Sequence, residues 1–157
     1  DLLIRHGGHA MAAGLTIDPA KLDEFRVRIN EIARMRIRPE LLQPELRLDA
    51  ETELAQLTVE RLDELSRIEP TGQGNPAISL VTRGVALAEP PRRIGKENKH
   101  VKLIVTDGVH RVEALWWNAG SSAMPEGAFD IAFKPKINEF RGSRSVQLNL
   151  LDWQTAS

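Results

Sequence analysis

The fold is decided by residues 101–117, which read VKLIVTDGVHRVEALWW. Two apolar stretches, 101–106 and 109–117, flank the pair Asp107-Gly108. Apolar residues that alternate with polar ones on both sides of an Asp-Gly pair predict two β-strands joined by a hairpin turn. We therefore expect the second half of the chain to form a β-sheet.

Three further strands are expected around this hairpin. They cover residues 78–88, 129–140 and 145–153, with a turn at 141–142 and a short helix at 118–124. Five strands with a helix between the third and the fourth follow the order of an OB-fold barrel, although short strands with glycine turns also suit other small barrels. The predicted class is α+β, with a five-stranded OB-fold barrel over residues 77–157.

The first 38 residues have the pattern of an α/β segment. Asp18 and Pro19 are typical of a helix start, and apolar residues at helical spacing predict an amphipathic helix to about Ile37. Before it we expect a strand at 2–5, a turn at 6–8, a short helix from 9 to 13 and a strand at 14–17.

Residues 39–76 are expected to connect the two parts. A short strand at 46–52 and a helix capped by Thr58 are predicted within this linker. Residues 69–76, rich in glycine and proline, are expected to form a loop without regular structure.

Composition narrows the class of protein. The chain has 157 residues, 41% hydrophobic and 27% charged, which predicts a globular protein. It has no cysteine, which excludes disulfides and thiol catalysis and fits a cytoplasmic location. Its apolar runs are too short to span a membrane. Because the sequence starts at Asp1 without Met, we expect a fragment of a longer protein.

Charge is unevenly distributed along the chain. Residues 1–90 hold 11 Lys and Arg against 15 Asp and Glu, whereas residues 91–157 hold 10 against 7. A basic second half favours a polyanionic partner, although an ordinary solvated surface gives the same count.

A glycine pair near the N-terminus is the first candidate site. If Gly7 and Gly8 precede a helix, their uncovered N–H groups and the helix dipole could bind a phosphate. His9 and Arg5 could each donate to another phosphate oxygen. The alternative is a tight turn with a packed histidine.

Aromatic and basic residues of the predicted barrel form the second candidate site. Trp116 and Trp117 are adjacent, so on a strand one should enter the core and the other should be exposed. An exposed indole among cations is suited to stacking on bases of a single strand. We select Trp116 for stacking, and the candidate cations are Arg92, Arg93, Lys96, Lys99, Lys102, Lys134, Lys136, Arg141 and Arg144.

No metal site is expected within these residues. Glu51 and Glu53 would share a face of a strand, but no histidine lies near them in the sequence. The four histidines do not have the spacing of a zinc motif. A two-metal nuclease needs several converging carboxylates, and no such set is apparent.

Three motifs, in the same order, resemble RecJ exonucleases of the DHH phosphoesterase superfamily. Residues 7–16, GGHAMAAGLT, resemble the glycine-glycine-histidine motif of the DHH-associated domain. Residues 70–76, PTGQGNP, resemble the loop that follows it in RecJ. Residues 137–148, INEFRGSRSVQL, resemble the last hairpin of the RecJ OB domain.

This resemblance implies a fold and an activity. Residues 1–38 would be the end of a DHH-associated domain, and the parent protein would degrade single-stranded DNA from 5′ to 3′ in recombination and repair. The resemblance implies Mn²⁺ or Mg²⁺ in an upstream DHH domain, and no cofactor in this fragment, which we expect to be inactive alone. It assigns Gly7, Gly8 and His9 to the phosphate side of the cleft.

The implied partners are single-stranded DNA and other repair proteins. Three other readings stay open: a DHH phosphoesterase acting on short nucleotides, a non-catalytic OB-fold module, and a barrel that binds a protein. The barrel argues against the first, because a mononucleotide needs no strand-holding surface. The glycine-glycine-histidine motif argues against the second.

Overall fold

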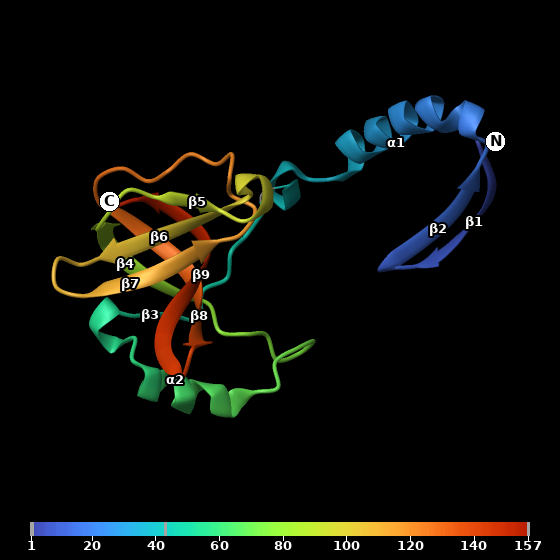
Figure 1. Ribbon diagram of the computed structural model, residues 1–157. Helices are drawn as coiled ribbons and strands as arrows, with labels where there is room; N and C mark the ends of the chain where they lie inside the picture. Colours follow the sequence, from blue (N-terminus) through green and yellow to red (C-terminus); the bar gives the residue numbers. More distant parts are fainter. Residues whose placement is uncertain (1, 43, 157) are drawn as a thin grey trace. The chain divides into compact units, whose positions relative to one another are not determined.

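The computed structural model describes residues 2–42 and 44–156 and divides the chain into two compact units (Figure 1). The first unit is Asp1–Leu46 and the second is Arg47–Ser157.

The first unit is a β-hairpin followed by a helix. Strands β1 (Leu3–His9) and β2 (Ala12–Ile17) pair antiparallel, and a 3-10 turn (Pro19–Lys21) leads into α1 (Leu22–Arg36). The side chain of Asp18 accepts a hydrogen bond from the N–H of Ala20 at 2.9 Å, which confirms the predicted cap. The helix ends at Arg36 with Ile37 as its C-cap, close to the expected end, and a 3-10 turn (Pro39–Leu42) follows.

The prediction of a turn and a short helix over residues 6–13 is wrong. Gly7 and Gly8 lie inside β1, opposite Gly14 and Ala13, and the chain turns at residues 10–11. A Cβ added to Gly8 would lie 2.4 Å from the backbone oxygen of Ala12. The close approach of the two strands therefore requires glycine there, and the motif builds a hairpin.

The second unit contains seven strands and one α-helix among the described residues. β3 (Ala50–Glu51) and α2 (Val59–Leu65) come first. They are followed by β4 (Leu80–Leu87), β5 (Arg92–Ile94), β6 (His100–Thr106), β7 (Arg111–Trp116), β8 (Phe129–Phe140) and β9 (Ser143–Thr155). Short 3-10 turns occur at Leu54–Gln56, Ser66–Ile68 and Lys96–Asn98.

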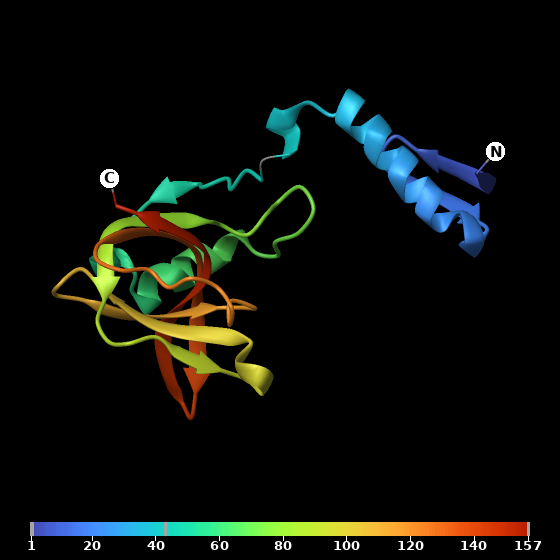
Figure 2. The same ribbon diagram turned by 90° about the horizontal axis from the view of Figure 1, so that it is seen from above.

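Five of these strands close into a ring. The sheet order is β3-β4-β8-β9-β7-β6-β5, and β4 also pairs with β6. All neighbours in the ring are antiparallel except β7 and β9, which are parallel. Seen from above, the strands curve around a common centre (Figure 2). This is the connectivity of the predicted OB-fold barrel.

Two local expectations about the barrel fail. Residues 118–124 form turns instead of a helix, because Asn118 has a φ of 59° and the N–H of Gly120 donates to the backbone oxygen of Lys99. Strand β5, which pairs with the edge of β6, was not predicted. Its three residues are too few to show an alternating pattern.

Helix α2 belongs to the barrel core. Thr58 caps it by accepting from the N–H of Arg61 at 3.3 Å, as predicted. Leu54, Leu57 and Leu62 are buried in the same cluster as the barrel strands. The helix packs against β8 and β9 and lies across the lower end of their ribbon in Figure 1. Much of the segment 39–76 is thus part of the second unit, and the connecting linker is shorter than expected.

An ion pair joins α2 to β9. Arg144 donates two hydrogen bonds to the carboxylate of Asp63, one of them 3.0 Å long. These bonds lower the pKa of Asp63 below its usual value. Arg144 also pairs with Glu139 at 3.1 Å.

A bulge bends β4 so that it can pair on both sides. Its first part pairs with β8, its last two residues pair with β6, and the register shifts between Thr82 and Val85. At the shift, the buried carboxylate of Asp130 accepts from the N–H of Gly84 at 3.0 Å and from Arg83 at 3.0 Å. Burial alone would raise the pKa of Asp130, but these donors and Gln154 lower it.

We predict that Leu62→Ala lowers the free energy of unfolding of the barrel. Leu62 is 7% exposed and lies in the core, and removing a buried leucine side chain costs about 2–5 kcal/mol. Urea unfolding followed by tryptophan fluorescence measures the change. Glu64→Ala, on the exposed side of α2, is the matched control and should change stability by less than about 0.5 kcal/mol. Equal effects of the two variants would show that α2 does not complete the core.

Candidate nucleic-acid interface

The register of the barrel strands defines one continuous outer face. Val101, Leu103 and Val105 of β6 are buried, so the residues between them point outward. The pairing then places outward residues of β7, β9 and β8 side by side. Trp117, which follows β7, joins this surface through its contacts with Asn149 and with the ring of His100. We call this surface the outer face, and its members are His100, Lys102, Ile104, Arg111, Glu113, Leu115, Trp117, Lys134, Lys136, Gln147 and Asn149.

Trp117 is the aromatic group of the outer face. Its side chain is 51% exposed, and its indole N–H donates to Oδ1 of Asn149 at 3.2 Å. The ring of His100 meets the indole edge-on, with centroids 4.7 Å apart. His100 is itself oriented by the backbone N–H of Asn118, which donates to its Nδ1 at 3.0 Å. The indole is therefore held in place while part of its surface is open.

The choice of Trp116 as the stacking residue is corrected by this geometry. Trp116 is partly buried and packs against the barrel core. The expectation that one of the two indoles faces inward and the other is exposed is confirmed. The alternation could not assign which one, because that depends on which face of β7 the barrel encloses.

Lys134 and Lys136 are two cations of the outer face without an acidic partner. Lys134 pairs in register with Asn149, and Lys136 with Gln147. Among residues 2–42 and 44–156 neither lysine makes an ion pair. Both line a groove of about 300 Å³ whose other wall includes Leu62 and Leu65 of α2.

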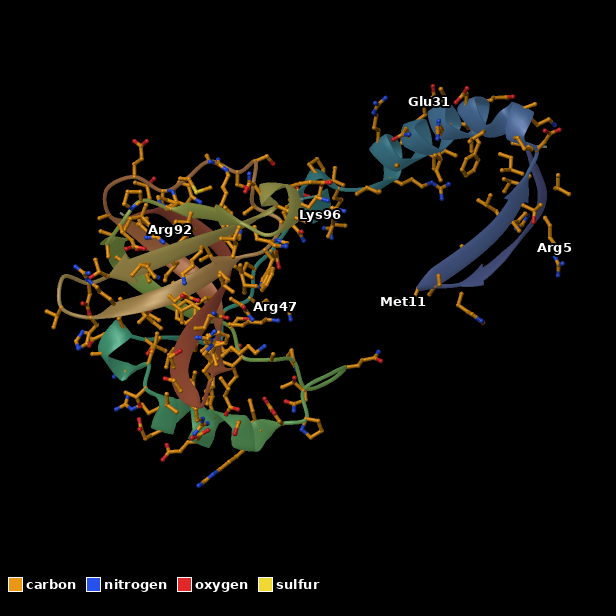
Figure 3. All side chains as sticks on the ribbon, in the orientation of Figure 1. Arg5, Met11, Glu31, Arg47, Arg92 and Lys96 are labelled. Atoms are coloured by element: carbon orange, nitrogen blue, oxygen red, sulfur yellow. The ribbon has the colours of Figure 1, made fainter. Side chains whose placement is uncertain are left out.

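Most candidate cations near β5 are already engaged. Arg92 pairs with Glu89 at 3.6 Å, Lys99 pairs with Glu97 at 2.9 Å, and Arg93 donates to the backbone oxygen of Gly120 at 2.8 Å. Lys96 is exposed and has no ion pair within the described part of the chain. Figure 3 labels Arg92 and Lys96 on this side of the barrel.

The last three candidate cations differ in their partners. Lys102 lies on the outer face but forms an ion pair with Glu113. Arg144 forms ion pairs with Asp63 and Glu139, so its guanidinium group stabilises the contact between β9 and α2. Arg141 lies at the tip of the β8–β9 hairpin, over the ring of Phe140 at 5.1 Å, and is exposed.

The candidates of the first unit lie on its hairpin. Arg5, Gly7 and four neighbours line an open hollow of about 330 Å³. His9 is exposed at the end of β1, and Arg5 is labelled on the same hairpin in Figure 3. No helix begins at this motif, so the predicted phosphate site at a helix N-terminus is wrong. Any phosphate contact here would come from a strand.

Within the described ranges, no group of three or more His, Asp or Glu side chains could hold a metal ion. These residues therefore do not fit a Mn²⁺ or Mg²⁺ centre. None of the described helices is long and apolar enough to cross a membrane.

Only Lys102, Lys134 and Lys136 of the outer face were selected from the sequence, and the other members were not: His100, Ile104, Arg111, Glu113, Leu115, Trp117, Gln147 and Asn149. They come from three strands, and only the register brings them together. A period-two pattern shows which residues of one strand share a face, but not which strands are neighbours.

The closed five-stranded ring, with an aromatic residue and cations on its outer face, defines an OB-fold domain. Comparison with known families identifies it further. The RecJ OB domain family matches residues 48–152, and the chain belongs to this family.

Similar proteins agree with this assignment. The chain is 32% identical over 155 residues to the single-stranded-DNA-specific exonuclease RecJ of Salmonella typhimurium, and 29% identical to that of Bacillus subtilis. Each match covers 97% of this chain, but only 26% and 20%, respectively, of those proteins. The crystal structure of RecJ from Thermus thermophilus in complex with Mn²⁺ matches 99% of this chain and 22% of its own, with a TM-score of 0.75 and 28% identity. The chain thus spans about a quarter or less of these relatives.

We predict that Trp117→Ala weakens single-strand binding, while Trp116→Ala mainly lowers stability. Loss of one stacked base costs roughly 1–3 kcal/mol, and loss of a packed indole costs about 3–5 kcal/mol of folding free energy. Fluorescence anisotropy with labelled oligonucleotides and urea unfolding separate the two effects. Trp117→Phe, which keeps an aromatic surface, should bind better than Trp117→Ala. Unchanged affinity in Trp117→Ala would exclude stacking by this residue.

Proposed function

We propose that this chain is the strand-binding C-terminal part of a RecJ-like exonuclease that degrades single-stranded DNA from 5′ to 3′ in recombination and repair. The observation that supports it best is the exposed Trp117 beside two lysines without acidic partners, on the outer face of a RecJ OB domain. The relatives that share this region are named as single-stranded-DNA-specific exonucleases.

The outer face has the two properties that a single strand requires. An indole can stack on any base, since every base has a π-face, and lysine ammonium groups neutralise phosphates of the backbone. Neither contact reads the edges of the bases. The face should therefore bind single strands with little sequence preference, and duplex DNA, whose bases are stacked and paired, more weakly.

The cutting chemistry belongs, in this proposal, to an upstream domain with Mn²⁺ or Mg²⁺. The Thermus thermophilus structures of RecJ are described as complexes with these ions. The described residues of this chain offer no ligand cluster for them. Gly7, Gly8, His9 and Arg5 would contribute to the phosphate side of the complete cleft from their hairpin. The cytoplasm is the proposed compartment, and other repair proteins are proposed partners.

Two alternatives are weighed against this proposal. A phosphoesterase for short nucleotides would not need the outer face, whose members extend over four strands. A stand-alone OB module would not need the first unit, and RecJ of Thermus thermophilus matches both units of this chain.

The proposal predicts a strong salt dependence that involves Lys134 and Lys136. Each phosphate neutralised on a single strand adds about −0.7 to the slope of log affinity against log salt. If about three or four cations take part, the slope should be roughly −2 to −3, and Lys134→Ala with Lys136→Ala should flatten it by about 1.4. Anisotropy titrations with an oligothymidine at several salt concentrations measure it. Arg67→Ala, an exposed cation that follows α2, is the control and should leave the slope within error. Affinity independent of salt, or equal affinity for duplex, would instead favour the protein-binding reading.

We also predict that the purified chain releases no nucleotides from labelled single-stranded DNA with Mn²⁺ or Mg²⁺. The reason is the missing ligand cluster within the described residues. Denaturing gels of the reaction products, run over a wide range of protein concentrations, provide the measurement. Nucleotide release that copurifies with the chain and is lost in a variant of one of its own carboxylates, such as Glu51→Gln, would contradict the prediction.

A further inference from the structure

Glu113 occupies the middle of the outer face. It lies on β7, between Ile104 of β6 and Gln147 of β9. The pair of Lys102 and Leu115 is two residues away in register. Of the side chains that define the outer face, it alone is a carboxylate. A negative charge at the centre of a surface for a polyanion is unfavourable for binding, because it repels phosphates at short range.

The contacts of Glu113 show what this charge does in the free protein. Its Oε2 forms the ion pair with Nζ of Lys102, and its Oε1 accepts from Nε2 of Gln147 at 2.7 Å. The side chains of Lys102 and Glu113 are 36% and 28% exposed, so a ligand on the outer face can reach both. Lys102 is therefore directed at Glu113 and neutralised.

The neighbouring row of the outer face has no such charge. This row crosses β6, β7, β9 and β8 through Lys102, Leu115, Asn149 and Lys134. Trp117 is bonded to Asn149 of the row. Strands of a sheet are about 4.8 Å apart, so the part of this row from β7 to β8 is roughly 10 Å long. That length suits one or two nucleotides of an extended strand, with a base on Trp117 and a phosphate at Lys134.

We propose that Glu113 is an affinity-limiting residue of the DNA-binding face. It neutralises Lys102 at the β6 end of the row, so that the strand is held at the other end, by Trp117, Asn149 and Lys134. The inference rests on the proposed strand-binding function. Its consequence is a weak hold on the strand. A surface that must let a strand advance as nucleotides are removed needs rapid release, and affinity differences of this kind appear mainly as changes in the dissociation rate.

The experiment compares Glu113→Gln with the unchanged chain in single-strand binding. Glutamine has the shape of glutamate and can still accept from Gln147, but it frees Lys102 for phosphate. We expect the salt slope to become steeper by about 0.7 and the affinity at about 0.1 M salt to rise roughly fivefold. Glu64→Gln on α2 changes the net charge equally away from the outer face and serves as the control.

A double-mutant cycle identifies Lys102 as the source of the gain. In the unchanged chain, Lys102→Gln should have little effect on the salt slope, because Glu113 already neutralises the charge of Lys102. In the Glu113→Gln background, the same substitution should abolish the gain. The first of these measurements does not depend on the folding of any Glu113 variant.

The possible outcomes separate this inference from the proposed function. If the unchanged chain does not bind single-stranded DNA, the proposed function fails. If it binds, but Glu113→Gln binds equally or more weakly, Glu113 does not limit affinity and the inference is overturned. A loss of slope in Lys102→Gln alone would likewise overturn it, since it would show that Lys102 already contacts phosphate in the presence of Glu113.

Discussion

The bend of β4 is the constraint on which the barrel depends. A flat strand cannot pair with β8 along one part and with β6 along the next, so the ring closes only if β4 changes direction between them. Gly84, with a φ of 64°, supplies the bend. The N–H of Gly84, which the bulge removes from the strand ladder, is satisfied by the buried carboxylate of Asp130. One hydrogen bond from β8 therefore compensates for the irregularity that makes closure possible.

The same network joins the segment before the barrel to the ring. Arg83, next to the bend, pairs with both Asp130 and Glu51, and Glu51 lies on β3, which runs parallel to β4. The chain then passes into α2, whose leucines enter the core. Much of the region that the sequence predicts to be a linker is therefore part of the barrel. The second unit begins at Arg47, and the family match begins next to it, at residue 48.

Closure also creates the outer face. Because β9 lies between β7 and β8, side chains from distant positions in the sequence become neighbours: Trp117 contacts Asn149, and Lys136 lies beside Gln147. Basic residues that the sequence cannot distinguish have different ion-pair partners in the structure. Lys134 and Lys136 have no acidic partner in the described part of the chain, Lys102 is neutralised by Glu113, and Arg144 secures α2. The charge available to a ligand is thus smaller than the count of basic residues suggests.

The sequence by itself determined the five strands of the ring, their hairpin at Asp107-Gly108, the helical start at Asp18, the helix capped by Thr58 and the RecJ resemblance. These are local properties, because a period of two, a cap and a turn need only neighbouring residues. The carboxylate of Asp107, for example, accepts from the N–H groups of His110 and Val109, which lowers its pKa to about 2. Tertiary structure alone decided that Gly7 and Gly8 pair within a hairpin, that Trp117 and not Trp116 is exposed, and which cations are free. Each of these depends on which strands become neighbours and which face the core covers, and that is set by the packing of segments far apart in the chain.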